Sequence, residues 1–201
     1  TWVIKPSYNA RGIGIYLTKK LKDIINLGKK SQSKVVQKYI EKPYLINGKK
    51  FDVRQWVLVT SWDPLEIYVF ETAYLKFCSK SFDLNDLSDN LRHLANYSIQ
   101  KGQDVDDDLV WSTQDFEKHI GLDYCWNTNM LPNIQDIVYR TLKCTQQSQI
   151  DSQMSNCFEI YGFDLLLDLE LNPWVIEINL SPACSERKSW LTKMLDDMAL
   201  G

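Results

Sequence analysis

The sequence has 201 residues, of which 44% are hydrophobic and 24% charged, so it can bury a core as one domain or as two small lobes. A short peptide and a fibre are excluded, and no apolar run approaches the roughly 20 residues that span a bilayer, so no membrane role is expected. The formal net charge is −3, but residues 1–54 hold thirteen Lys and Arg against three Asp and Glu, and the rest hold ten against twenty-three.

The basic segment 1–54 suits an anionic partner, because a positive cleft concentrates polyphosphates or acidic polypeptides. A solvated lysine face on a helix is the alternative for the lysines around 17–30. No basic tract with interleaved aromatic residues is found, so nucleic acid is not expected as a partner. The five cysteines form no CxxC pair and the two histidines lack metal-ligand spacing, which favours free thiols in the cytosol over a zinc site or disulfides.

Apolar runs separated by turn residues fill the first third of the chain. The elements predicted there are a strand at 2–4, a helix at 17–28, and strands at 35–40, 51–62 and 67–70. Asn47-Gly48 is a strong hairpin-turn signal before the strand at 51–62, and Asp63-Pro64 marks a turn after it.

Polar and irregular sequence dominates residues 78–110, where an acidic cluster near 102–110 predicts a mobile loop. The elements predicted after it are a helix at 133–146, a Gln/Ser-rich linker at 146–156, a hairpin of strands at 158–168 and 174–180, and a helix at 188–199. Strands that alternate with helices, together with antiparallel hairpins, indicate a mixed α+β architecture.

The predicted hairpin carries a group of oxygen-bearing side chains. If its turn centres between residues 170 and 171, Asp164 lies opposite Glu177, and Asn179 shares the face of Glu177. The residues expected to point to the other, buried face are Ile176, Ile178 and Leu180. Two carboxylates and an amide oxygen suit Mg²⁺, which completes its shell with water or substrate phosphates, so a nucleotide polyphosphate is the natural partner. The alternative is an acidic sheet face that points to water.

A second candidate site follows the first predicted strand. Lys5 ends that strand, and Gly12 and Gly14 in the next loop let backbone N–H groups approach an anion. An ordinary glycine turn is the alternative. The segment 37–40 ends the next strand and can present backbone polar groups and Lys38 to a base, although a strand edge needs no ligand to explain it.

Charged residues alternate with apolar ones at the start of the strand at 51–62. Lys50, Asp52 and Arg54 fall on one face, which suggests a wet cleft, and Arg54 suits a transferring phosphoryl group because its guanidinium fork matches phosphate. An exposed, salt-bridged sheet face is the alternative. No Ser/His/Asp or Cys/His arrangement is found, so covalent catalysis is not expected.

Taken in order, the blocks KP with RGIGI, VVQKYI, KFDVRQW, HLANYSIQK and GFDLLLD with WVIEIN resemble the tubulin tyrosine ligase-like family over residues 2–184. The resemblance implies the ATP-grasp fold, an α+β architecture whose two lobes grip ATP, with the part before Thr1 missing. We expect a central lobe at 1–75 and a C-terminal lobe at 76–201 that carries the magnesium hairpin and the acidic loop.

The resemblance also implies a role for each matching residue. Phosphates would contact Lys5 and the loop Arg11, Gly12, Ile13 and Gly14, and adenine would contact Gln37, Lys38, Tyr39 and Ile40. The nucleotide cleft would be lined by Lys50, Asp52, Arg54, Asn96 and Lys101, and magnesium would be bound by Asp164, Glu177 and Asn179. Arg54, Glu177 and Lys5 are expected to act directly in catalysis.

Within the family, Gln55-Trp56, the stretch from Leu58 to Leu65 and Asn96 look more like the glycine ligases than the glutamate ligases. The resemblance then implies that ATP activates an acceptor glutamate of a tubulin tail as an acyl phosphate, which the amine of glycine attacks. A glutamate ligase, or a non-catalytic module that binds nucleotide or microtubules, is the alternative. We expect a monomer located in the cytoplasm, cytoskeleton and cilium.

Two departures from the family pattern are found. Ala10 and Ile13 stand where relatives often carry a hydroxyl and a second basic residue, and Glu71 stands near a position where many carry arginine. Glu71 is compatible with activity if Lys76 substitutes for that arginine. Otherwise it indicates altered amino-acid recognition or lost activity.

Overall fold

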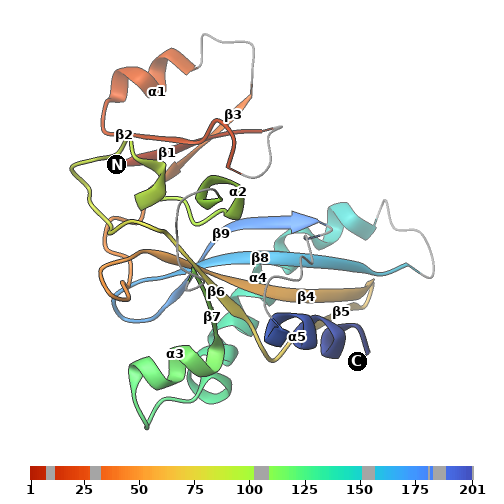
Figure 1. Ribbon diagram of the computed structural model, residues 1–201. Helices are drawn as coiled ribbons and strands as arrows, with labels where there is room; N and C mark the ends of the chain where they lie inside the picture. Colours follow the sequence, from red (N-terminus) through yellow and green to blue (C-terminus); the bar gives the residue numbers. More distant parts are fainter. Residues whose placement is uncertain are drawn as a thin grey trace. The chain divides into compact units, whose positions relative to one another are not determined.

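The computed structural model describes residues 1–7, 12–27, 33–101, 109–150, 157–180, 182 and 189–200 (Figure 1). The chain divides into two compact units, one made of 1–52, 76–110 and 167–170, and the other of 53–75, 111–166 and 171–201. Both contain antiparallel strands and helices, so the predicted mixed α+β architecture is confirmed. The lobe boundary near residue 75 and the mobility of the acidic loop stay predictions; residues 102–108 of that loop lie outside the described ranges.

The first unit contains a three-stranded antiparallel sheet in the order β2-β1-β3 (Figure 1). The elements of this unit are β1 (Trp2–Pro6), β2 (Tyr16–Thr18), α1 (Leu21–Leu27), β3 (Lys34–Lys38), η1 (Asn90–Arg92) and α2 (Tyr97–Gln100). Its core is built on Val3, Leu17 and Tyr39, against which Phe82 packs. Burial of these side chains holds the sheet to the loop that follows residue 78.

The predicted helix at 17–28 is wrong at its start. Leu17 lies in strand β2, opposite Val3 of β1, and helix α1 begins only at Leu21. Between the two, the Thr18 hydroxyl accepts a hydrogen bond from the Lys20 backbone N–H at 3.0 Å and donates one to Asp23 at 2.7 Å. Such local side-chain bonds favour a turn and a helix start over a continuous helix.

The larger sheet has six strands in the order β7-β6-β4-β8-β9, with β5 also paired to β4 (Figure 1). Its strands are β4 (Phe51–Trp62), β5 (Leu65–Val69), β6 (Tyr74–Phe77), β7 (Val110–Ser112), β8 (Glu159–Leu167) and β9 (Pro173–Leu180). The accompanying helices are α3 (Thr113–Ile120), the π-helical turn η3 (Trp126–Met130), α4 (Leu131–Ile150) and α5 (Ser189–Leu200). Helix α4 packs on β5 and β9.

Two predictions about the second half need correction. Helix α4 continues to Ile150 where a linker from residue 146 was predicted, because Gln146 donates a hydrogen bond to the Trp62 carbonyl at 2.6 Å and fixes that turn. Residues 151–156 of the predicted linker lie outside the described ranges. On β9, Ile176, Ile178 and Leu180 were expected to be buried, but Ile176 is half-buried and the other two are exposed. Glu177 and Asn179 are half-buried, so near the end of β9 the better covered face is the one that carries the polar side chains. Among the helices that the structure describes, none is long and apolar enough to cross a membrane.

Candidate active site

A guanidinium–carboxylate pair joins the two central strands of the larger sheet. Arg54 on β4 lies directly opposite Asp164 on β8. Arg54 Nε is 2.8 Å from Asp164 Oδ1 and Nη2 is 3.1 Å from Oδ2, so the pair is bidentate. Asp164 is only 3% exposed. A two-point contact of this kind fixes the direction of both side chains, which is the property that a phosphate- or metal-binding site needs.

The pKa of Arg54 reports the same environment. Burial is the largest single influence and by itself would lower this pKa, but the charge of Asp164 and its hydrogen bond, with smaller contributions from Tyr74 and Glu177, together raise the pKa above its ordinary value. Arg54 therefore stays charged, and the carboxylate of Glu177 lies close enough to act on it.

Gly162 makes room for Arg54. A Cβ atom at Gly162 would lie 2.9 Å from Arg54 Nη1 and 2.7 Å from the Cβ of Pro182. Both distances are shorter than van der Waals contact, so only glycine leaves the guanidinium where it is. The glycine of the GFDLLLD block was not among the predicted site residues, although its place two residues before Asp164, on the same strand face, is a signal that sequence reasoning could have used.

Two of the three predicted magnesium ligands are hydrogen-bonded to each other. Asn179 donates through Nδ2 to Asp164 Oδ2 at 3.2 Å, and half-buried Glu177 precedes it on the same face of β9. The donor atoms available from these three side chains are carboxylate and amide oxygens, which fit a hard cation such as Mg²⁺. Arg54 already neutralises Asp164, so the alternative of an acidic face that simply points to water is wrong for Asp164. The metal role itself stays a prediction.

Lys50 and Asp52 form a buried ion pair in the first unit. Lys50 Nζ is 2.6 Å from Asp52 Oδ1, and the two residues are 4% and 6% exposed. Neither an open cleft wall nor an exposed sheet face describes these side chains. Burial would lower the pKa of Lys50, but Asp52, and then Tyr39 and Cys78, outweigh it and raise the pKa, so the ammonium stays charged.

The residues of the predicted adenine segment 37–40 differ in how far their side chains are buried. Lys38 is exposed and pairs with Glu41 at 2.9 Å, whereas Tyr39 is buried in the core. The Tyr39 hydroxyl lies 3.1 Å from Nδ1 of His93, and His93 Nε2 lies 2.9 Å from the Asp86 carbonyl oxygen. Because a carbonyl only accepts, His93 carries its proton on Nε2 and its Nδ1 accepts from Tyr39. Gln37 and Ile40 are half-buried.

The glycine loop lies against the short helix α2. Gly12 and Gly14 have φ angles of 75° and 77°, which favour glycine. A Cβ atom at Gly12 would lie 2.5 Å from Ile99 Cδ1 and 3.0 Å from Asn96 Oδ1, so predicted residues from two distant blocks meet here. Lys101 is exposed at the end of α2.

The remaining predicted residues of the phosphate site are Lys5, Ile13 and Arg11. Lys5 lies in β1, paired with Val35 of β3, and Ile13 is exposed. Arg11 lies outside the described residues. The structure thus brings together Gly12 with Asn96, and separately Lys50 with Asp52 and Tyr39.

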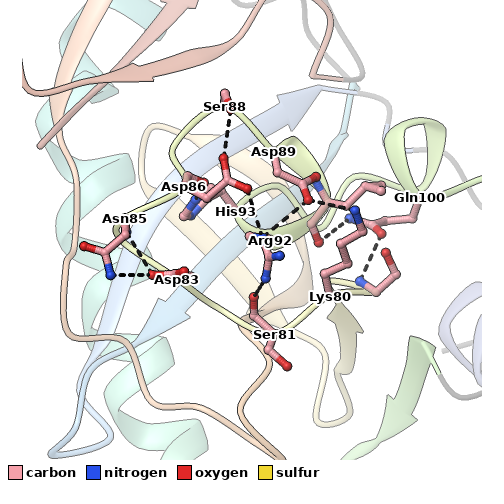
Figure 2. A network of polar contacts seen from close by, with 12 residues as sticks. Lys80, Ser81, Asp83, Asn85, Asp86, Ser88, Asp89, Arg92, His93 and Gln100 are labelled. Carbon is pink, nitrogen blue, oxygen red and sulfur yellow. Dashed lines mark hydrogen bonds and ion pairs between the residues drawn. The ribbon is translucent and has the colours of Figure 1, made fainter.

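Side chains that sequence reasoning missed support the first unit. His93 and Gln100 are both buried and both bond to backbone carbonyls of neighbouring segments (Figure 2). Both residues belong to the HLANYSIQK block, in which they stand on either side of a run of mainly apolar and small residues. That pattern was the signal of their role that the sequence offered. Among the described side chains, no group of three or more His, Cys, Asp and Glu that could hold a metal is found.

Comparison with known proteins bears on this arrangement. The sequence model of the Tubulin-tyrosine ligase family matches residues 1–199. Tubulin glycylase 3E of Tetrahymena thermophila is 46% identical over 98% of this chain and 15% of that protein. Tubulin monoglycylase TTLL3 of Homo sapiens is 38% identical over 90% of this chain and 25% of that protein.

A relative that is named as a polyglutamylase is also similar to this chain. Probable alpha-tubulin polyglutamylase Ttll1 of Tetrahymena thermophila is 33% identical over 91% of this chain and 48% of that protein. The chain thus spans between 15% and 25% of the two glycylases and about half of the polyglutamylase.

Proposed function

Because the chain belongs to the tubulin-tyrosine ligase family, we propose that the protein is an ATP- and magnesium-dependent ligase that joins glycine to glutamate side chains of tubulin tails. The observation that carries the proposal is the 46% identity to a tubulin glycylase along 98% of the chain. An enzyme with this substrate would reside in the cytoplasm, at the cytoskeleton and in cilia, and we expect it to act as a monomer.

The proposed reaction needs an activated carboxylate. ATP would convert the acceptor glutamate into an acyl phosphate, and the amine of glycine would attack it to give an isopeptide bond, ADP and phosphate. The chain's own task is to position these groups and to neutralise their charge. We assign Asp164, Glu177 and Asn179 to the magnesium ion, because their oxygens suit it.

Arg54 is assigned to the transferring phosphoryl group, since its fork is already held in one direction by Asp164. We assign the nucleotide to first-unit residues that are not buried in the structure or lie outside its described residues, namely Lys5, Arg11, Gly12, Ile13, Gly14, Gln37, Lys38, Ile40, Asn96 and Lys101. Lys50, Asp52 and Tyr39 are buried and would support these residues without contacting the nucleotide. Lys5 would assist at the phosphates.

A glutamate ligase is the second candidate, and the 33% identity to a probable polyglutamylase favours keeping it. Mass spectrometry of tubulin tail peptides separates the two. The full-length protein is incubated with ATP, Mg²⁺ and equimolar, differently labelled glycine and glutamate. Glycine mass on a glutamate side chain is expected; glutamate mass would replace the proposal by the second candidate. ATP binding without any addition would indicate a non-catalytic module.

Glu177→Gln tests the metal assignment. The variant keeps the shape of the side chain but removes the charge that a hard cation prefers, so we expect the addition of glycine to be abolished while the thermal unfolding temperature stays close to that of the wild type. Glu170→Gln, on an exposed turn residue between β8 and β9, is the matched control and should remain active. Full activity of Glu177→Gln would exclude Glu177 as a ligand.

A further inference from the structure

Helix α2 is too short to hold its own position. It has four residues, all described, and of these only Gln100 is buried. One turn of helix is not stable in water without tertiary contacts, because the entropy lost in forming the first turn exceeds the stabilisation from its few hydrogen bonds. Contacts to the rest of the first unit must therefore fix where α2 lies.

The Gln100 amide provides those contacts with both of its ends (Figure 2). Its Oε1 accepts a hydrogen bond from the Ser79 backbone N–H at 3.0 Å. Its Nε2 donates to the Leu94 carbonyl at 2.7 Å and lies 3.4 Å from the Leu91 carbonyl. One side chain thus connects α2 to three backbone positions.

Backbone contacts also connect the partner of Gln100 to the buried Lys50–Asp52 ion pair. Ser79 follows Cys78, whose backbone N–H donates to the Lys50 carbonyl at 2.9 Å. On its other side, α2 meets the glycine loop, where the backbone of Gly12 lies directly against Ile99 and Asn96. A displacement of α2 would therefore change the environment of Gly12 and Asn96.

We propose that Gln100 is a positioning residue for nucleotide binding. By anchoring α2 it sets the places of Asn96 and Lys101 and the packing of the Gly12 turn, without touching the nucleotide itself. This inference rests on the proposed function, since the nucleotide roles of Asn96, Lys101 and Gly12 come from there.

Gln100→Glu in the full-length protein is the main test. Glutamate keeps the shape and the acceptor for Ser79 but has no N–H for the carbonyls of Leu94 and Leu91. We expect the affinity for Mg²⁺-ATP, measured by titration calorimetry, to fall at least about tenfold. The KM for ATP should rise by a similar factor while kcat at saturating ATP changes much less, a division that a general loss of stability would not produce.

Two further variants sharpen the test. Gln100→Leu removes the donor and the acceptor together and should weaken ATP binding at least as much. Lys80→Met removes the Lys80–Asp89 ion pair of 2.8 Å in the same network but none of the hydrogen bonds of Gln100, and should bind ATP like the wild type. All titrations are made below the unfolding transition of each variant.

A readout without nucleotide separates this inference from the proposed function. The N–H groups of Ile99 and Gln100 donate to the carbonyl of Asn96, which caps α2, and that of Lys101 donates to the Tyr97 carbonyl. The hydrogen exchange of these groups therefore reports the order of α2. We expect these N–H groups to exchange faster in ligand-free Gln100→Glu than in the wild type, and to exchange at the wild-type rate in Lys80→Met. Unchanged exchange and unchanged ATP affinity in Gln100→Glu would overturn the positioning role. Failure of the wild type to bind ATP would instead overturn the proposed function.

Discussion

Gly12 and Gly48 have nearly the same backbone conformation in different surroundings. Their φ angles are 75° and 72°, so an alanine at either position costs about 1–2 kcal/mol of stability. A Cβ atom at Gly48 meets only Ser81 Oγ at 3.9 Å, whereas at Gly12 it meets Ile99 and Asn96. Because these are side-chain atoms that can move, the added effect at Gly12 is a rearrangement of Ile99 and Asn96 more than a further loss of folding energy.

We therefore expect Gly12→Ala and Gly48→Ala to lose similar stability in urea unfolding, and only Gly12→Ala to lose ATP affinity, by about tenfold or more. Calorimetric titration with Mg²⁺-ATP measures the second quantity. Equal ATP affinities in the two variants would mean that contact between the glycine loop and α2 does not matter for binding.

His93 makes the stability of the first unit depend on pH. Burial lowers its pKa, with an opposing contribution from the Asp86 carbonyl, so the folded protein holds His93 neutral where the unfolded chain begins to take up a proton. The stabilisation is complete above the unfolded pKa of about 6.5 and decreases as the pH falls below it.

We expect the free energy of unfolding to decrease between pH 6.5 and 5 by at most about 1.4 kcal/mol per pH unit from this residue. Urea unfolding at several pH values measures the slope. His93→Gln, which cannot titrate, should be less stable at pH 8 and should lose this part of the slope. An identical slope in the variant would assign the pH dependence to other groups.

At the scale of elements, helix α3 depends on its first turn. Ser112 accepts a hydrogen bond from the Asp115 backbone N–H at 3.2 Å, and the Asp115 carboxylate accepts one from the Ser112 backbone N–H at 3.0 Å. This reciprocal pair is a capping box. Ser112→Ala should cost about 1 kcal/mol in urea unfolding. Gln114→Ala, on the exposed side of the same turn, should stay within about 0.5 kcal/mol of the wild type.

Element boundaries were predictable where local chemistry marks them. Strand β4 has the predicted bounds, because the turn residues Asn47-Gly48 and Asp63-Pro64 mark where it begins and ends. Strand β6 was missed because all four of its residues are buried, including Lys76, so no alternation is visible in the sequence. Helix α3 was missed although Ser112 and Asp115 have capping-box spacing.

The site was predictable in its composition and less so in its pairing. Asp164, Glu177 and Asn179 could be grouped from hairpin periodicity alone, because they are near in sequence. The Arg54–Asp164 pair joins residues 110 positions apart, and the register between β4 and β8 is set by tertiary packing that no local pattern reports. The burial of Lys50 and Asp52 was missed for the same reason.

At the scale of the whole molecule, charge is divided along the chain. Residues 1–54 carry an excess of ten positive charges. Association with an acidic tail should therefore weaken steeply with salt, since screening acts over about 10 Å at 0.1 M. We expect Lys20→Glu with Lys22→Glu, on exposed positions, to slow association with glutamate-rich peptides severalfold in surface plasmon resonance.

Lys118→Glu with Lys143→Glu is the control for that experiment, because it makes the same double charge reversal on exposed residues of the acidic part of the chain. Its association rate should match that of the wild type. If the two double variants slow association equally, net charge rather than the basic segment governs the encounter.

The Arg54–Asp164 pair has one consequence for how ligands assemble on the larger sheet. The guanidinium occupies both oxygens of Asp164, so it is a built-in competitor of any cation that approaches this carboxylate. An anion that draws Arg54 toward itself removes the competitor, and a cation on Asp164 in turn releases Arg54 for the anion. If a magnesium ion and a phosphoryl group bind as proposed, we therefore expect their bindings to be linked with positive cooperativity, so that neither binds alone as well as both together.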